Sequence, residues 1–174
     1  MHRQAIALAL LAAVAFGVGT PLAKLLLGAI DPWLLAGILY LGAGAGLLVF
    51  RAWVPPRSEA PLRRADLPRL AVVVVSGGVL GPLLLMAGLA RTDAATASLA
   101  LNVEAVATMA IAWVVFREPL DRRLAAGAFA IVAGAVLLAW MGPGRLDTGA
   151  LLVAAACVAW AIDNSASREL GHVD

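Results

Sequence analysis

Six apolar segments, separated by short polar stretches, are the feature that most constrains what this chain can fold into. Each segment holds about the 17–25 residues that an α-helix needs to cross a hydrocarbon layer roughly 30 Å thick. Hydrophobic residues make up 63% of the chain, whereas soluble domains contain ~45–50%, so a soluble fold would leave large apolar patches exposed. We therefore expect an all-α, polytopic transmembrane bundle of six helices. The segments are Ala5–Leu27, Trp33–Phe50, Leu70–Ala90, Ala94–Phe116, Leu124–Met141 and Gly149–Arg168.

Arginine residues fall almost entirely in alternate connections, and this asymmetry predicts the orientation. With the N-terminus in the cytoplasm, the outside loops hold only Arg91 and Arg145. The inside stretches hold Arg3, Arg51, Arg57, Arg63, Arg64, Arg69, Arg117, Arg122 and Arg123. Because basic residues concentrate on the cytoplasmic side, we expect a multi-pass protein of a plasma membrane, the bacterial inner membrane. The arginines flank spans and lack interleaved aromatics, so nucleic acid is not an expected partner.

Residues that could support catalysis or metal binding are scarce. His2 and His172 stand at the chain ends, and the one cysteine, Cys157, lies in an apolar stretch. The sequence contains no HExxH motif, no Ser/His or paired-Asp constellation and no phosphate-transfer signature. We therefore expect no enzyme activity, no metal site and no cofactor.

Glycine and proline stand where they predict close helix packing and irregular backbone. Small residues spaced for packing in lipid are Gly42 with Gly46, Gly77 with Gly81, and Ala126 with Ala130 and Gly134. The first segment also contains Gly17, Gly19 and Pro21, and the third contains Gly77, Gly78, Gly81 and Pro82. Proline removes a backbone hydrogen bond and glycine loosens the turn, so a kink or local break is expected in both helices. Such breaks occur where transporters coordinate substrate, although ordinary kinks are more frequent.

Glu104 is the most informative single residue because it lies midway along the fourth apolar segment. An ionised side chain there costs at least ~2.5–3.5 kcal/mol on insertion scales. Either Glu104 is a coupling or substrate-contacting carboxyl that exchanges a proton in a central cavity, or it is a structural group bonded to a neighbouring helix. We favour the first, since intramembrane acids mark functional sites. Thr108 shares its face of the helix, while Asn102 shares another face with Ser98.

An internal repeat relates the sixth segment to the first. Laying Asn164 on Thr20 also lays Trp160 on Phe16 and Arg168 on Lys24. Five helices separate the copies, and an odd number reverses direction, so the repeat is inverted, as in many secondary transporters. Residues 1–141 are then one five-helix repeat, and residues 142–174 are the start of a second, truncated one. Asp163, next to Asn164, is equally compatible with a functional role and with a structural pair to a cation such as Lys24.

Four stretches together carry a resemblance to a known family. They are Phe16-Gly17-Val18-Gly19-Thr20-Pro21-Leu22-Ala23-Lys24, Ala97-Ser98-Leu99-Ala100-Leu101-Asn102-Val103-Glu104-Ala105, Trp113-Val114-Val115-Phe116-Arg117-Glu118-Pro119-Leu120, and Gly127 to Gly134. In their order and spacing they resemble the EamA-type members of the drug/metabolite transporter superfamily. The resemblance implies a ten-helix permease built of two inverted five-helix repeats, of which helices seven to ten are missing here.

The expected function is that of a secondary transporter that moves a small organic solute or metabolite by alternating access, with proton coupling through Glu104. The alternative is a non-transporting membrane assembly or regulatory subunit. Expected partners are the lipid bilayer and a small-molecule solute, together with either a second copy in a homodimer or a missing C-terminal half. Candidate substrate-binding or coupling residues are Glu104, Asn102, Thr108, Asp163, Asn164 and Thr20.

Overall fold

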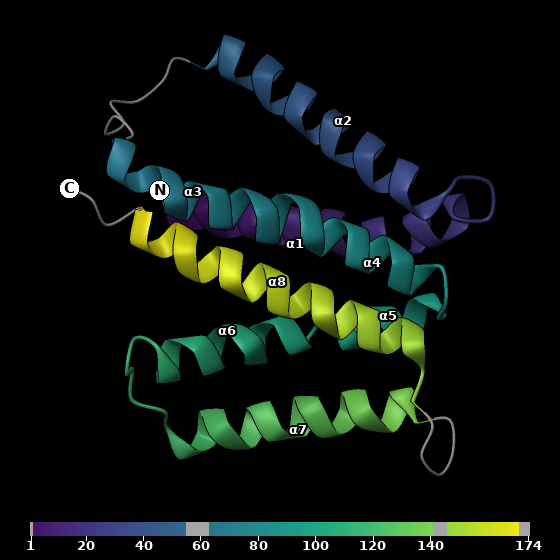
Figure 1. Ribbon diagram of the computed structural model, residues 1–174, viewed down its shortest axis with the longest axis vertical. Coiled ribbons are helices and arrows are strands. Elements are labelled where there is room, and N and C mark those ends of the chain that lie inside the picture. Colours follow the sequence, from purple (N-terminus) through teal and green to yellow (C-terminus); the bar gives the residue numbers. More distant parts are fainter. Residues whose placement is uncertain (1, 55–62, 141–145, 171–174) are drawn as a thin grey trace.

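The computed structural model describes residues 2–54, 63–140 and 146–170, and the elements in these ranges are helices joined by turns and short connections, with no β-strand among them (Figure 1). The elements are α1 (His2–Leu26), α2 (Pro32–Trp53), η1 (Arg64–Asp66), α3 (Leu67–Val73), η2 (Val74–Leu80), α4 (Gly81–Leu89), α5 (Ala94–Ala100), α6 (Val103–Val114), α7 (Arg122–Ala139) and α8 (Thr148–Leu170). The expected all-α class is confirmed.

Six helical stretches of the described chain are long and apolar enough to cross a membrane. They run over Ile6–Leu26, Pro32–Trp53, Arg64–Leu89, Ala94–Val114, Arg122–Ala139 and Thr148–Arg168. The third stretch begins six residues before the expected Leu70, because a 3-10 turn and the proline in the first turn of α3 extend the helix toward Arg64. η1, α3, η2 and α4 thus form the third span, and α5 with α6 form the fourth.

α8 lies at the centre of the bundle, between the third span and α6 (Figure 1). Its residues Val153, Ala156 and Cys157 are completely buried. Glycines let the helices approach: a Cβ atom on Gly81 would lie 2.4 Å from the Trp160 indole nitrogen, and one on Gly88 would lie 2.8 Å from the Gly149 carbonyl oxygen. Without a hydrophobic driving force between helices in lipid, such close backbone packing holds them together.

The other small-residue pairs have no such role in the described chain. A Cβ atom added to Gly42, Gly46 or Gly134 would meet nothing within 4 Å. Close packing through glycine is therefore concentrated where the third span meets α8.

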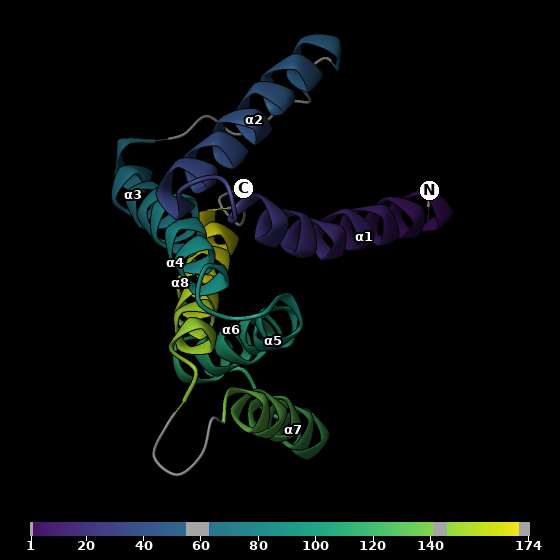
Figure 2. The ribbon, with the colours of Figure 1, turned by 90° about the vertical axis from the view of Figure 1, so that its right-hand side faces the viewer.

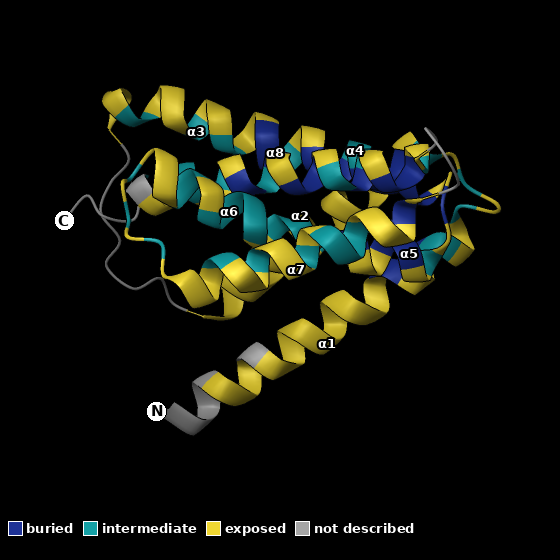
Figure 3. Ribbon diagram, turned by 90° about the horizontal axis from the view of Figure 1, so that it is seen from below, coloured by how far each residue is buried: buried dark blue, intermediate teal, exposed yellow. Residues whose placement is uncertain are grey.

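α1 and α2 leave the bundle in different directions (Figure 2). They touch it near the turn that joins them, where Thr20 and Ala23 of α1 and Leu35 and Ala36 of α2 are buried. Most of the remaining α1 surface is exposed (Figure 3), and Phe16 has 57% of its area accessible. These long apolar faces are what a helix presents to lipid or to another membrane segment.

The third span contains an interruption of regular α-helix, and the first does not. α1 runs as one continuous helix through Gly17, Gly19 and Pro21, so it has no local break there, and the expected kink at Pro21 stays a prediction. Pro21 removes a single backbone bond, and the turns on both sides keep the helix intact. In the third span, by contrast, the π-helical stretch η2 ends directly before Gly81 and Pro82.

Aspartates begin the three helices that start at the end opposite the N-terminus. Asp31 accepts a hydrogen bond from the backbone of Trp33 at 2.9 Å, and Asp93 accepts from the backbones of Ala95 and Thr96, both at 2.9 Å. Asp147 caps α8 through the Gly149 backbone N–H at 2.7 Å. These carboxylates satisfy N–H groups that a helix start leaves free, and they also favour the positive end of the helix dipole.

Two cationic side chains lie at the C-terminal end of the third span, on the side of the molecule opposite the N-terminus. The Lys24 ammonium donates to the Leu89 carbonyl, and Arg91 donates to the Ala87 carbonyl at 2.7 Å. Carbonyls in the last turn have no partner within the helix, so Lys24 both caps this helix and fastens α1 to it.

Candidate functional site

Two neighbouring residues of α8 point to different helices in the middle of the bundle. Asn164 donates through its side-chain nitrogen to Oε1 of Glu104 on α6, at 2.9 Å. The Asp163 carboxylate lies instead against Gly77 of η2, where an added Cβ atom would be 2.1 Å from Oδ2. Ser167, one turn along α8, donates to Oδ1 of Asp163 at 3.1 Å. α8 thus carries polar groups toward the third and the fourth span at one depth.

Glu104 stands in the first turn of α6, because the fourth span is not one uninterrupted helix. A turn at Leu101 and Asn102 separates α5 from α6. The Cys157 thiol of α8 packs at this turn, 3.6 Å from the carbonyl oxygens of both Ala100 and Leu101. An acidic residue in the first turn of a helix is favoured by the helix dipole. The turn therefore gives Glu104 an electrostatic environment that a mid-helix position lacks.

The remaining candidates of the fourth span do not join this contact. Asn102, in the turn, donates to carbonyls of the preceding helix α5, at 3.0 Å to Leu99 and 3.4 Å to Ser98. Thr108 is half-buried on α6 and makes no hydrogen bond with Glu104 in the described chain. The structure thus brings together Glu104 and Asn164 among the expected residues and leaves Asn102 to support the turn before α6.

The Gly77 carbonyl is the second polar centre, and the sequence analysis did not single it out. It accepts the Tyr40 hydroxyl at 3.1 Å and the Trp160 indole N–H at 3.2 Å. The π-helical register leaves it free: the Gly81 N–H bonds to Ser76, and the next residue, Pro82, has no N–H to offer. The signal in the sequence was the run Gly77-Gly78-Val79-Leu80-Gly81-Pro82.

A cavity of about 470 Å³ opens between α1, α2, α4 and α8. Thr20 and Gly19 of α1 line it, as does Pro82 of α4. Tyr40 and Trp160, which share the Gly77 carbonyl, form another part of its wall. No charged residue is among the described residues that line it. Thr20, a candidate from the sequence, therefore belongs to an apolar cavity and not to the contact between Glu104 and Asn164.

Arg168 lies in the last turn of α8, at the end of the molecule where the N-terminus also lies (Figure 1). Its guanidinium forms an ion pair with Glu118 at 2.6 Å and lies 5.4 Å from the centre of the Phe116 ring. Both partners of the ion pair are about half exposed, so the pair contributes little to stability. It does join α8 to the segment that follows α6.

The described chain contains six helices long and apolar enough to cross a membrane, with polar groups and a cavity between them, as expected of a multi-pass membrane protein. The chain belongs to the EamA-like transporter family, which matches residues 3–140.

A curated relative supports the same assignment. A protein of Methanothermobacter thermautotrophicus, described as an uncharacterized transporter, is 31% identical over 179 residues, which cover 92% of this chain and 52% of the relative. The chain spans about half the length of the curated relative it matches. No solved structure matches this chain.

Proposed function

We propose that this chain is part of a secondary transporter that moves a small organic solute by alternating access, with Glu104 as the proton-coupling group. The observation that carries the proposal is the 2.9 Å hydrogen bond from Asn164 to Glu104, which joins α8 to α6 within the apolar part of both helices. Polar side chains at such a depth are costly and mark solute or proton pathways.

Protonation gives this contact two states. An ionised Glu104 only accepts hydrogen bonds, so both of its oxygens can face the Asn164 amide and the start of α6. A protonated carboxyl becomes a donor as well, and it no longer gains from the positive end of the α6 dipole. Proton binding therefore weakens the contact between α6 and α8, the kind of change that can shift one helix against another.

The exposure of the pair supports a cavity on this side of α8. Asn164 is exposed and Glu104 is half-buried among the described residues. Lipid offers such groups no hydrogen bond, so this surface faces water or further protein in the working transporter. A second five-helix repeat, or a second copy of the chain, would supply the opposite wall. The proposed division of the chain, 1–141 and 142–174, places α8 at the start of that second repeat.

The apolar cavity supports a solute of modest size and low charge. Its volume of about 470 Å³ lies within the roughly 300–1,000 Å³ typical of small-molecule sites. Thr20 supplies a hydroxyl, and the aromatic side chains of Phe16, Tyr40 and Trp160 supply flat apolar walls. We place the protein in the bacterial inner membrane with its N-terminus in the cytoplasm, on the asymmetry of its arginines.

The test is transport by the full chain in proteoliposomes that contain a pH-sensitive dye. A panel of radiolabelled amino acids, amines and sugars is offered at acid and at alkaline outside pH, and uptake and proton movement are recorded together. We expect at least one solute to be taken up with a pH dependence that Glu104→Gln removes. Glu118→Gln is the matched control, because Glu118 pairs with Arg168 at the end of the helices. Unchanged pH-dependent uptake in Glu104→Gln would disprove the coupling role, and no uptake of any solute would favour an assembly or regulatory subunit.

A further inference from the structure

A groove between α6 and α7 lies apart from both polar centres. It encloses about 420 Å³, and its walls come from Val106 and Met109 of α6 and from Leu124, Gly127 and Ile131 of α7. We call it the α6–α7 groove. α6 packs less extensively against α7 than against α8. The groove follows the space between α6 and α7. Leu124 is 57% exposed, so the groove opens to the surroundings of the helices.

Small residues keep the groove open. A Cβ atom added to Gly127 would meet nothing within 4 Å, so no neighbouring side chain fills the space above this glycine. Ala105 and Ala128 on the facing helices are also part of the lining. None of the wall residues other than Arg123 carries a polar side chain, so the groove offers little to the polar groups of a soluble metabolite.

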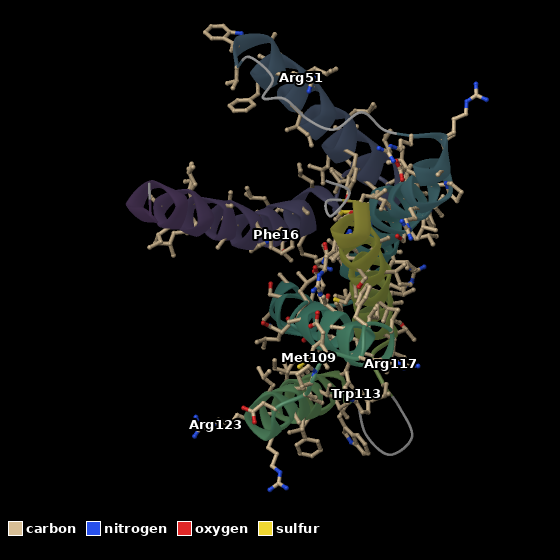
Figure 4. The ribbon with its side chains drawn as sticks, turned by 90° about the vertical axis from the view of Figure 1, so that its left-hand side faces the viewer. Phe16, Arg51, Met109, Trp113, Arg117 and Arg123 are labelled. Carbon is tan, nitrogen blue, oxygen red and sulfur yellow. The ribbon has the colours of Figure 1, made fainter. Side chains whose placement is uncertain are left out.

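One end of the groove is cationic. Arg123, in the first turn of α7, completes the lining. It forms no ion pair with a described carboxylate, and the nearby Glu118 is paired with Arg168. Asp121 lies two residues earlier and begins α7. Figure 4 views the molecule from the end at which α7 begins, and it shows Arg123 and Arg117 on opposite sides of the pair formed by α6 and α7.

An apolar groove at the end of a membrane span, with a cation that has no ion-pair partner among the described residues, matches the two parts of a lipid. We propose that the α6–α7 groove binds an acyl chain of an anionic phospholipid whose phosphate pairs with Arg123. Charge complementarity selects the headgroup, since basic pockets between transmembrane helices on the cytoplasmic side bind anionic lipids. A neutral lipid could fill the groove but would gain nothing from Arg123. This site is independent of the proposed transport cycle, because it uses neither Glu104 nor the 470 Å³ cavity.

Native mass spectrometry of the full chain in mild detergent tests the site. The protein is incubated with equal amounts of phosphatidylglycerol and phosphatidylcholine that carry identical acyl chains, so any preference reports the headgroup alone. We expect the wild type to retain phosphatidylglycerol preferentially and Arg123→Gln to lose about fivefold of that preference, since one basic residue near the surface contributes about that factor. Arg51→Gln, at the same end of the molecule but on α2, is the matched control and should behave as the wild type.

A second pair of variants tests the groove itself. Gly127→Leu fills the groove without removing charge, and we expect it to lower retention of both lipids. Gly134→Leu is its control, because Gly134 also has open space around it but does not line the groove. Thermal unfolding of each variant, followed through Cys157, establishes that it is folded.

Three results would overturn the proposal. Equal losses in Arg123→Gln and Arg51→Gln would mean that anionic lipid is attracted only by net charge. Full retention of both lipids in Gly127→Leu would mean that no chain enters the groove. Loss of a dimer in Gly127→Leu, with lipid retention intact, would assign the groove to a second copy of this chain.

Discussion

The Gly81→Ala substitution tests whether the third span and α8 depend on close contact at Trp160. The added Cβ atom would lie 2.4 Å from the indole nitrogen and 2.7 Å from Cε2, closer than real Cβ contacts come. The indole must therefore move, and its 3.2 Å hydrogen bond to the Gly77 carbonyl is lost. Overpacking costs ~1–3 kcal/mol and the lost hydrogen bond about 0.5–1.5 kcal/mol, while replacing glycine by alanine returns roughly 0.4–1 kcal/mol. We expect a net destabilisation of about 2 kcal/mol.

The assay uses the chain's own cysteine. Cys157 is completely buried and is the one cysteine of the sequence. A thiol-reactive fluorescent dye therefore reacts with it only on unfolding, and no cysteine has to be introduced. Gly78→Ala is the matched control, because it changes the same residue type in the same π-helical stretch but meets nothing within 4 Å. We expect a lower thermal midpoint for Gly81→Ala and an unchanged or higher one for Gly78→Ala. Equal destabilisation of both variants would refute the contact argument and point to the backbone of η2 instead.

Two further predictions concern single hydrogen-bonding groups. Hydrogen bonds from the Thr96 side chain and backbone hold the pKa of Asp93 below its usual range, so the stability it contributes is present above the unfolded-state pKa and is lost as pH falls through the folded-state value. Asp93→Ala should lower the free energy of unfolding by about 1 kcal/mol at neutral pH and make it less dependent on acid pH. Thermal melts over a pH series would measure both effects. If the stability of the variant fell with acid as steeply as that of the wild type, the capping role of Asp93 would be contradicted. Trp160→Phe should cost about 1 kcal/mol by removing its bond to Gly77, whereas Trp140→Phe, at an exposed position, should leave the same melts unchanged; equal effects would contradict the assigned role of the indole.

The six spans could be predicted from the sequence because hydropathy and length respond directly to the thickness of the bilayer. Ala94 was expected to begin the fourth span, and it does. The interruption of that span at Leu101 and Asn102 was not predicted. Neither residue is a glycine or a proline. Besides the local bond from the Asn102 side chain to Leu99, the turn is supported by the Cys157 thiol of α8, a contact between distant residues that no local pattern predicts.

The candidate site was likewise predictable in part from the sequence. Glu104 and Asn164 could each be recognised, because a polar group inside an apolar segment is conspicuous by its cost. That they bond to one another depends on the rotation of α8 about its axis, which hydropathy does not encode. The Gly77 carbonyl was missed as a hydrogen-bond acceptor for side chains. It is left free because the π-helical register would pair it with the backbone N–H of residue 82, which is a proline and has none. For the first helix, glycine and proline predicted a kink or a local break, and α1 has no break at Pro21.

The most direct test of the central claim is a double-mutant cycle on the contact between α6 and α8. The ratio of solute uptake at acid to that at alkaline pH is measured in proteoliposomes for the wild type, Glu104→Gln, Asn164→Ala and the double variant. If the two residues form one coupling contact, each single change removes most of the pH dependence and the double change removes little more. If Asn164→Ala keeps the full pH dependence, or if the two effects simply add, the contact is not the coupling element and the account is wrong.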